Sequence, residues 1–172
     1  GSSARQIFVG TFYRFCLELL SEDQGFSHLI ARPSLSLPEG LLGAFERVAI
    51  LEEIASSQFL DYPKRKLHYY LDRISWAKQN LLSSADCKLE FPCEDETFVR
   101  LYRGYQKHLE EHNRYDLDDL IFETVRELRD DSDRCQQLQL RFRSFVIDEY
   151  QELNEAQYRL LRFIISDFAD LC

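Results

Sequence analysis

The sequence predicts a mostly helical protein that contains two short, buried, parallel strands. Apolar residues recur at the spacing of an amphipathic helix along most of the chain. Two short runs, 7–10 and 145–147, are instead continuously apolar and rich in β-branched and aromatic residues. Such runs are typical of strands buried on both faces of a parallel sheet. Because two strands do not make a stable sheet alone, we expect the 172 residues to be a piece of a larger protein.

The helices follow from the spacing of their apolar residues and from the residues that can begin them. Six stretches show helical spacing: 12–20, 41–55, 67–81, 98–109, 117–128 and 156–164. Thr11 can cap the first of them, and Pro63 suits the first turn of the third. Two segments, 22–40 and 83–94, combine Pro with Ser or Gly and predict loops.

Charge is unevenly distributed along the chain. The net charge of −9 argues against binding of nucleic acid over the whole surface, which usually requires a basic surface. One helical stretch is nevertheless basic, with Lys64, Arg65, Lys66, Arg73 and Lys78. An acidic block follows between residues 116 and 133. We therefore expect a local basic face that can meet phosphate groups.

Targeting and cysteine patterns predict a cytoplasmic protein that is not secreted and has no membrane partner. No apolar run approaches the roughly 18 residues that cross a bilayer, and the first residues show no signal-peptide pattern. Five cysteines at irregular spacing favour reduced thiols over disulfides. His108 and His112 are four residues apart on an expected helix, but no third ligand stands nearby, so no metal cage is assigned.

The segment 145–151 carries the clearest chemical signal. Asp148 and Glu149 directly follow the second apolar run, so they are expected at the carboxyl end of a strand, where open α/β sheets bind ligands. In a nucleotide hydrolase such an Asp holds Mg²⁺, and the adjacent Glu can polarise the attacking water. Strand ends also carry acidic residues for solubility, so this pattern alone leaves both interpretations open.

Four segments resemble the UvrD/Rep-type superfamily 1 DNA helicases, in the order in which that family has them. Residues 148–161 are similar to motif II (Walker B), D-E-[FY]-Q-D-x-N-x-x-Q-Y-x-L-L. Residues 9–16 resemble the G-T-F-H-x-[FL] segment that follows motif Ia. Residues 74–80 resemble the I-S-x-A-K-N stretch, and 102–120 resemble the Y-x-x-Y-q … D-F-D-D-L segment. The chain is identified as a member of this family.

The resemblance implies an architecture and an activity. Residues 1–22 and 115–172 would belong to a first RecA-like α/β domain (1A), and residues 23–114 to its helical insertion, subdomain 1B. The implied activity is ATP- and Mg²⁺-dependent 3′-to-5′ translocation on single-stranded DNA and unwinding of duplex DNA, in DNA repair or recombination. The implied partners are single-stranded and duplex DNA and the remainder of the helicase chain.

The resemblance also implies residue roles. Asp148 is the Mg²⁺ ligand, Glu149 the catalytic base, and Gln151 the residue that senses the γ-phosphate. The single-stranded DNA contacts are Thr11, Phe12 and Tyr13, although these residues also fit a capped helix start with core aromatics. The duplex contacts fall on Lys64, Arg65, Lys66 and Lys78. The chain departs from the family at Glu152, where Asp is usual, and at Tyr13, where His is usual.

The phosphate-binding half of an ATPase site is not in this sequence. It contains no G-x-x-x-x-G-K-[ST] loop, so nothing cradles the phosphates, and we expect the isolated chain to be inactive. The open edge of the strand 145–147 is then an expected site of self-association. Two alternatives stay open: the motor part of a helicase–nuclease subunit, and a non-catalytic helical module that docks DNA or protein.

Overall fold

The computed structural model describes residues 7–20, 41–58, 66–90, 96–166 and 169–172, and these residues are mostly helical. Eight α-helices lie in these ranges: α1 (Phe12–Leu20), α2 (Ala44–Ser57), α3 (Leu67–Gln79), α4 (Ser84–Glu90), α5 (Glu96–Glu111), α6 (Leu117–Asp130), α7 (Ser132–Arg141) and α8 (Glu155–Ile164). The remaining elements are the short strands β1 (Ser144–Phe145) and β2 (Asp170–Leu171) and the 3₁₀ turn η2 (Tyr150–Glu152). The predicted mostly helical class is confirmed. The loop predicted at 22–40 lies outside the described residues.

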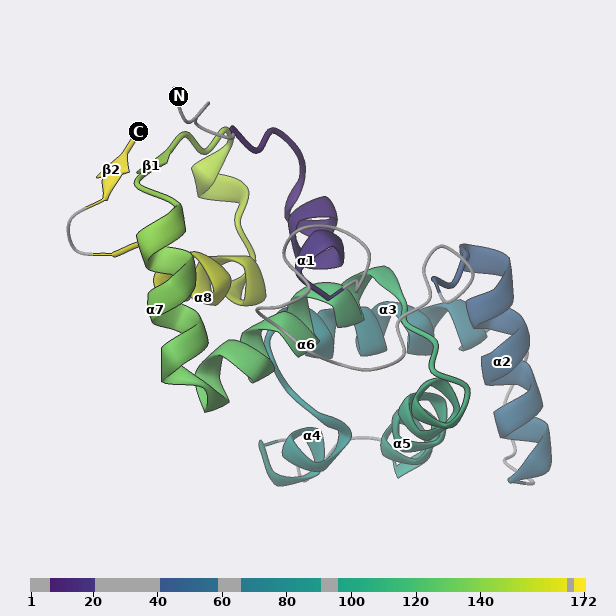
Figure 1. Cartoon of the computed structure of the whole chain (residues 1–172). Coiled ribbons are helices and arrows are strands. Elements are labelled where there is room, and N and C mark those ends of the chain that lie inside the picture. Colours follow the sequence, from purple (N-terminus) through teal and green to yellow (C-terminus); the bar gives the residue numbers. More distant parts are fainter. Residues whose placement is uncertain (1–6, 21–40, 59–65, 91–95, 167–168) are drawn as a thin grey trace.

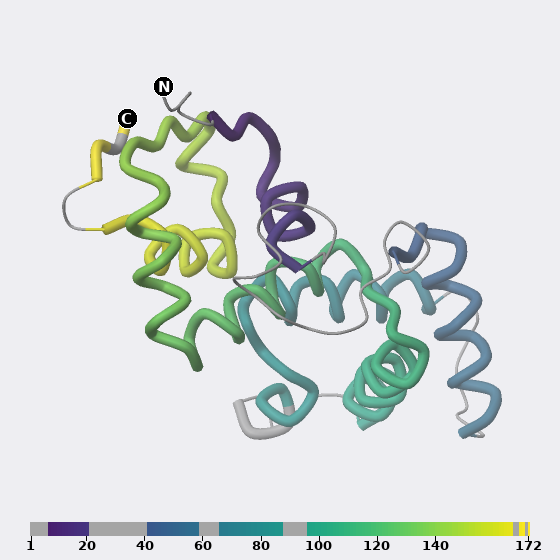
Figure 2. The backbone as a smooth tube through the Cα atoms, in the orientation of Figure 1, coloured from purple at the N-terminus to yellow at the C-terminus, as the bar shows by residue number. Residues whose placement is uncertain are grey.

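The helices enclose two separate hydrophobic cores. The first core is built from the apolar faces of α1, α6, α7 and α8. The second is built from α2, α3, α4 and α5. In Figure 1, α2 to α5 occupy the right and lower part of the molecule, α7 and α8 lie on the left, and α1 lies at the upper centre. Helix α6 runs between the two groups, as the backbone tube of Figure 2 also shows.

Both groups are tied together where the chain passes between them. Leu41 and Tyr115 form an isolated parallel bridge, and the Leu42 N–H donates to the Tyr115 carbonyl at 2.8 Å. Inside the second group, α5 approaches α2 closely at Gly104. A Cβ at Gly104 would lie 2.7 Å from the Ile54 side chain, so a glycine is needed for this approach.

Two helices occur where the sequence did not predict them. Helix α4 falls in the predicted loop 83–94, and its start is stabilised by Ser83, whose N–H and hydroxyl both donate to the Asp86 carboxylate. Helix α7 contributes only Cys135 and Leu138 to the core, which is too few apolar residues to make a visible stripe. Its first turn is capped by the Asp131 carboxylate.

The predicted strand pairing between 7–10 and 145–147 is wrong. Ile7 and Val9 belong to no strand and are 84% and 80% exposed, while Phe8 alone turns inward to meet Phe15, with ring centroids 5.4 Å apart. An apolar run becomes a strand only where a partner supplies hydrogen bonds, and no described residue does so here. Strand β1 instead pairs in parallel with β2, with Ser144 opposite Asp170.

The described helices give no indication of a membrane span. None of them is both long enough and apolar enough to cross a bilayer.

Candidate functional site

The candidate site begins where the extended segment after α7 ends. Strand β1 continues the ladder beyond its two residues, because the Ile147 N–H donates to the Cys172 carbonyl and the Cys172 N–H to the Phe145 carbonyl, both at 3.0 Å. Asp148 is therefore the first residue beyond the ladder. Its side chain is exposed, and one of its oxygens accepts the Glu149 N–H at 3.0 Å. This places the carboxylate at the carboxyl end of β1, as expected.

Glu149 turns the chain at this point. Its backbone is left-handed, with φ 52° and ψ 41°, a conformation that costs a non-glycine residue on the order of 1–2 kcal/mol. The turn η2 follows, closed by a hydrogen bond of 2.9 Å from the Glu152 N–H to the Glu149 carbonyl. The Gln151 amide folds back and donates to the Glu149 carboxylate at 2.5 Å. The turn thus brings Glu149 and Gln151 together on an exposed surface.

Helix α8 directly follows this turn and anchors it to the first core. Asn154 caps the helix, since its side-chain oxygen accepts the Gln157 N–H at 2.9 Å while the Gln157 side chain accepts the Asn154 N–H at 3.1 Å. The apolar face of α8 is buried in the first core through Ala156, Leu160 and Leu161. A shallow pocket of about 470 Å³ opens above the cap, lined by Tyr150, Gln151, Leu153, Asn154, Glu155 and Tyr158.

The chemistry available at the turn is that of exposed oxygen ligands. Asp148 and Glu149 are both exposed, so their carboxylates can reach a bound ion or a water molecule. Mg²⁺ prefers such ligands and is usually held by one or two carboxylates together with water and substrate phosphates. Within the described residues no group of three or more His, Cys, Asp or Glu forms a complete protein cage for a metal ion. The donor set therefore fits a Mg²⁺ that is shared with a phosphate-bearing substrate.

The three residues at the start of α1 have a clear structural role. Thr11 is exposed and caps α1, with its hydroxyl accepting the Arg14 N–H at 3.3 Å and its carbonyl accepting the Phe15 N–H at 3.0 Å. Phe12 and Tyr13 are half-buried and pack against the first core. Burial and the nearby carboxylates of Asp118 and Asp116 raise the pKa of Tyr13. The capped-helix interpretation is thus realised, and contact with DNA stays a prediction.

The basic stretch expected to contact duplex DNA is divided by the structure. Lys64 and Arg65 lie outside the described residues, and Lys66 is exposed at the start of α3. Lys78 is different, because its side chain is only 1% exposed and its ammonium lies inside the protein. The predicted duplex contact at Lys78 is wrong, because the side chain points from α3 toward α5 and α6 and not into solvent. A buried ammonium paired with carboxylates does not reach a phosphate backbone.

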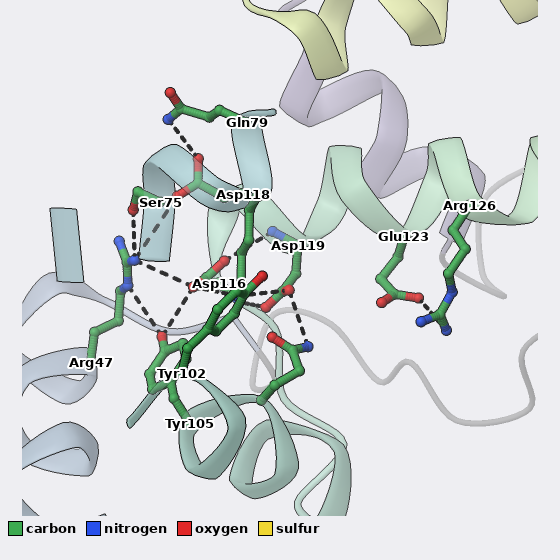
Figure 3. Close-up of polar contacts among 12 residues, drawn as sticks. Arg47, Ser75, Gln79, Tyr102, Tyr105, Asp116, Asp118, Asp119, Glu123 and Arg126 are labelled. Atoms are coloured by element: carbon green, nitrogen blue, oxygen red, sulfur yellow. Dashed lines mark hydrogen bonds and ion pairs between the residues drawn. The ribbon is translucent and has the colours of Figure 1, made fainter. Parts of the chain in front are cut away.

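Lys78 is the centre of a buried ionic cluster. Its Nζ lies 2.9 Å from Asp116 Oδ2 and 2.8 Å from Asp119 Oδ1, and both carboxylates are almost fully buried. The Tyr105 hydroxyl donates to Asp116 at 3.1 Å, and the Arg47 guanidinium lies 3.4 Å from the same oxygen. Figure 3 shows Arg47 of α2 and Tyr105 of α5 pointing toward Asp116 and Asp119, which both lie at the start of α6.

Burial and charge act against each other within this cluster. Burial alone would raise the pKa of Asp116, but the charges of Lys78 and Arg47 outweigh it and lower that pKa to about 2. Burial raises the pKa of Asp119 to about 7, because the attraction of Lys78 is offset in part by repulsion from Asp116. Burial disfavours the charged form of Lys78, yet the two carboxylates raise its pKa, so the ammonium stays charged.

Sequence reasoning missed this cluster. The basic residues near Lys78 and the acidic block after residue 116 were interpreted as separate surface features. One local signal was available: Asp116 and Asp119 have capping-box spacing before an apolar run, and each side chain accepts the other's backbone N–H. No local signal joins Lys78 to Asp116, which are 38 positions apart.

Comparison with known families gives one match over the whole chain. A family described as the UvrD/REP helicase N-terminal domain matches residues 1–172.

Individual relatives are more distant. The "ATP-dependent DNA helicase PcrA" of Staphylococcus aureus (strain Mu50) is 25% identical over 173 aligned positions, which cover 100% of this chain. The PcrA of Staphylococcus epidermidis (strain ATCC 12228) is 24% identical over the same length. The chain spans 23% of the length of each of these relatives.

Proposed function

The chain belongs to the UvrD/REP helicase N-terminal domain family, and from this we propose that it supplies the Mg²⁺- and water-binding part of an ATP-driven DNA helicase. In this proposal the complete protein moves 3′-to-5′ along single-stranded DNA and unwinds duplex DNA during repair or recombination. The observation that carries the proposal is the turn 148–151. It presents two exposed carboxylates and an amide at the end of β1, which is where nucleotide hydrolases of the open-sheet type act.

The two carboxylates take different roles in this proposal. Asp148, the first residue beyond the strand ladder, would hold the Mg²⁺ ion. When bound, that ion neutralises the charge that develops on the transferred phosphoryl group. Glu149, held in a left-handed turn, would accept a proton from the attacking water.

Gln151 would report the state of the nucleotide. Its amide donates to the Glu149 carboxylate, so a displacement of Glu149 would also move Gln151 in η2. Helix α8 begins four residues after Gln151 and is fixed by its cap and its buried face. This continuity supports transmission from the hydrolysis site into the first core.

DNA contact is proposed at two places. Thr11 is exposed at the start of α1, and Phe12 and Tyr13 beside it are half-buried, so their outer faces can stack on bases. The exposed Lys66, with Lys64 and Arg65, is proposed to meet the phosphates of the duplex. The separate core of α2 to α5 supports assignment of residues 23–114 as a helical insertion on the domain formed by 1–22 and 115–172.

The test of the proposed activity uses the full-length protein and tailed duplexes. With ATP and Mg²⁺, strand separation is expected from a duplex with a 3′ single-stranded tail and not from one with a 5′ tail. Separation of the 5′-tailed duplex alone would reverse the proposed direction. Binding of both duplexes without ATP hydrolysis would instead support the non-catalytic docking module.

A further inference from the structure

Lys78, Asp116 and Asp119 lie between the two hydrophobic cores and belong to neither. Lys78 is on α3, Asp116 caps α6, and Asp119 is in the first turn of α6. Tyr105 and Gln106 reach the cluster from α5, with the Gln106 amide 3.3 Å from Asp119 Oδ1. Four helices therefore meet at this point once Arg47 of α2 is included.

The contacts of the cluster are directional. Two carboxylates accept from the Lys78 ammonium, and the Tyr105 ring lies 5.1 Å from the same nitrogen. Each carboxylate also accepts a backbone N–H of the α6 cap, so neither can move without loosening the start of α6. Apolar contacts between helices tolerate small sliding or rotation. A buried, fully paired ionic cluster tolerates much less, because any displacement leaves a charge without its partner.

A second set of hydrogen bonds surrounds Lys78, Asp116 and Asp119. The Arg47 guanidinium donates to the Ser75 hydroxyl at 2.9 Å and to the Tyr105 hydroxyl at 3.2 Å. The Gln79 amide donates to the Asp118 carboxylate at 3.0 Å. Figure 3 shows these side chains around Asp116 and Asp118. The start of α6 is thus tied to α2 and α3 on several sides.

Helix α6 connects this cluster with the helices of the first core. It packs along both α1, which begins with the proposed DNA contacts, and α8, which follows the proposed hydrolysis site. Tyr13 on α1 lies close enough to Asp118 and Asp116 to be influenced by their charges. The insertion, the DNA contact and the hydrolysis site therefore share one helix.

We propose that Lys78 is a positioning residue: with Asp116 and Asp119 it forms a buried joint that fixes the orientation of helices α2–α5 on α6. The joint keeps the helical insertion aligned with α1 and α8. Its mechanical consequence, that motion produced by ATP hydrolysis is transmitted to the insertion, rests on the proposed function. The alignment itself does not.

The alignment is tested by a distance measurement in the full-length protein. Spin labels carried by unnatural amino acids are placed at Glu53 on α2 and Arg162 on α8, both exposed. The unmodified joint is expected to give one narrow distance distribution. Lys78→Met is expected to broaden or shift it, because the two carboxylates lose the charge that holds them together. Lys107→Met, which removes a lysine 72% exposed on α5, is the matched control and is expected to leave the distribution unchanged.

A neutral form of the joint covers the case in which Lys78→Met does not fold. Combining Lys78→Met with Asp116→Asn and Asp119→Asn removes the lysine charge together with the charges of both carboxylates, and Arg47 keeps Asp118 as its ionic partner at 3.9 Å. A broadened distribution in this folded triple variant supports the joint. A distribution as narrow as that of the unmodified protein overturns it.

The functional consequence is measured as strand separation per ATP hydrolysed. The folded joint variant is expected to keep ATP hydrolysis and to lose strand separation, whereas a merely stabilising role would lower both together. Equal loss of both, with unchanged distances, contradicts the joint. Absence of ATP hydrolysis in the unmodified protein contradicts the proposed function, while the distance measurement still decides the joint.

Discussion

Among single residues, Asp148 and Glu149 are adjacent but differ in backbone position, and the proposal gives them different roles. Asp148 stands directly beyond the strand ladder, and Glu149 occupies the left-handed turn. Asp148→Asn in the full-length protein should therefore weaken Mg²⁺-dependent nucleotide binding itself, because the ion loses an anionic ligand. Titration with a fluorescent nucleotide, with and without Mg²⁺, checks this. Unchanged Mg²⁺-dependent affinity would show that the ligand lies elsewhere.

The titration of Asp119 gives a second prediction at this scale. Its pKa is about 7 in the folded protein and 3.8 ordinarily, so between about pH 4 and pH 7 the folded state binds one more proton than the unfolded state. This contribution to stability is present at low pH and is lost as the pH rises through about 7. The groups that face it are Lys78, Asp116, Tyr102, Tyr105 and Gln106.

Urea unfolding of the 172-residue chain at several pH values measures this effect. Relative to Asp119→Asn, the free energy of unfolding of the unmodified chain should fall between about pH 4 and pH 7. The lowered pKa of Asp116 acts in a different window, below about pH 4, where stability is lost as the pH falls. Parallel pH profiles of the two proteins would contradict the assigned titration.

At the scale of elements, the cap of α8 connects the candidate site to the core. Asn154→Ala removes one half of the capping box and should destabilise the chain by about 1 kcal/mol. Gln137→Ala on the exposed face of α7 is the control, and it should change stability by less than about 0.5 kcal/mol. Both values come from urea unfolding, and equal effects of the two changes would show that the cap contributes nothing.

The elements differ in how far the sequence predicts them. Helices α3, α5 and α6 carry regular apolar stripes, so their spacing is sufficient. Helix α4 has no apolar stripe that would predict it, because its first residues are polar. Its start is stabilised by the Ser83–Asp86 contact, which the sequence pattern did not indicate. The run at 7–10 is apolar but unpaired in the described residues, because strand formation depends on partners that apolar composition does not specify. The position of Asp148 at the carboxyl end of a strand was predicted, because it directly follows the apolar run 145–147, whereas the left-handed turn at Glu149 was not.

At the scale of the whole molecule, the joint at Lys78 could not be predicted. Lys78 is on α3, and its partners come from α5 and α6. No sequence periodicity relates residues that meet only after the helices pack. A lysine in a basic stretch is normally exposed, and here tertiary packing overrides that expectation. The resemblance of residues 74–80 and 102–120 to a family marked the right segments without showing that they meet.

The exposed edge beside β1 leads to a prediction about association. Val146 is 87% exposed next to the short strand pair, and such edges can pair with another chain. The 172-residue chain should therefore associate at high concentration, and Val146→Lys should reduce association by placing a charge at this edge. Sedimentation velocity over a range of concentrations measures it. A chain that stays monomeric throughout would show that the edge is not adhesive.

ATP turnover by the full-length protein in the presence of single-stranded DNA tests most directly whether the turn 148–151 is the hydrolysis site. Glu149→Gln should leave nucleotide binding nearly normal and lower turnover by roughly 10²–10⁴-fold, since a positioned base is removed while its shape is kept. Glu111→Gln, a change at an exposed carboxylate on α5, is the control and should leave turnover unchanged. DNA-stimulated turnover that survives Glu149→Gln at the level of this control would contradict the assignment of the turn 148–151 as the hydrolysis site.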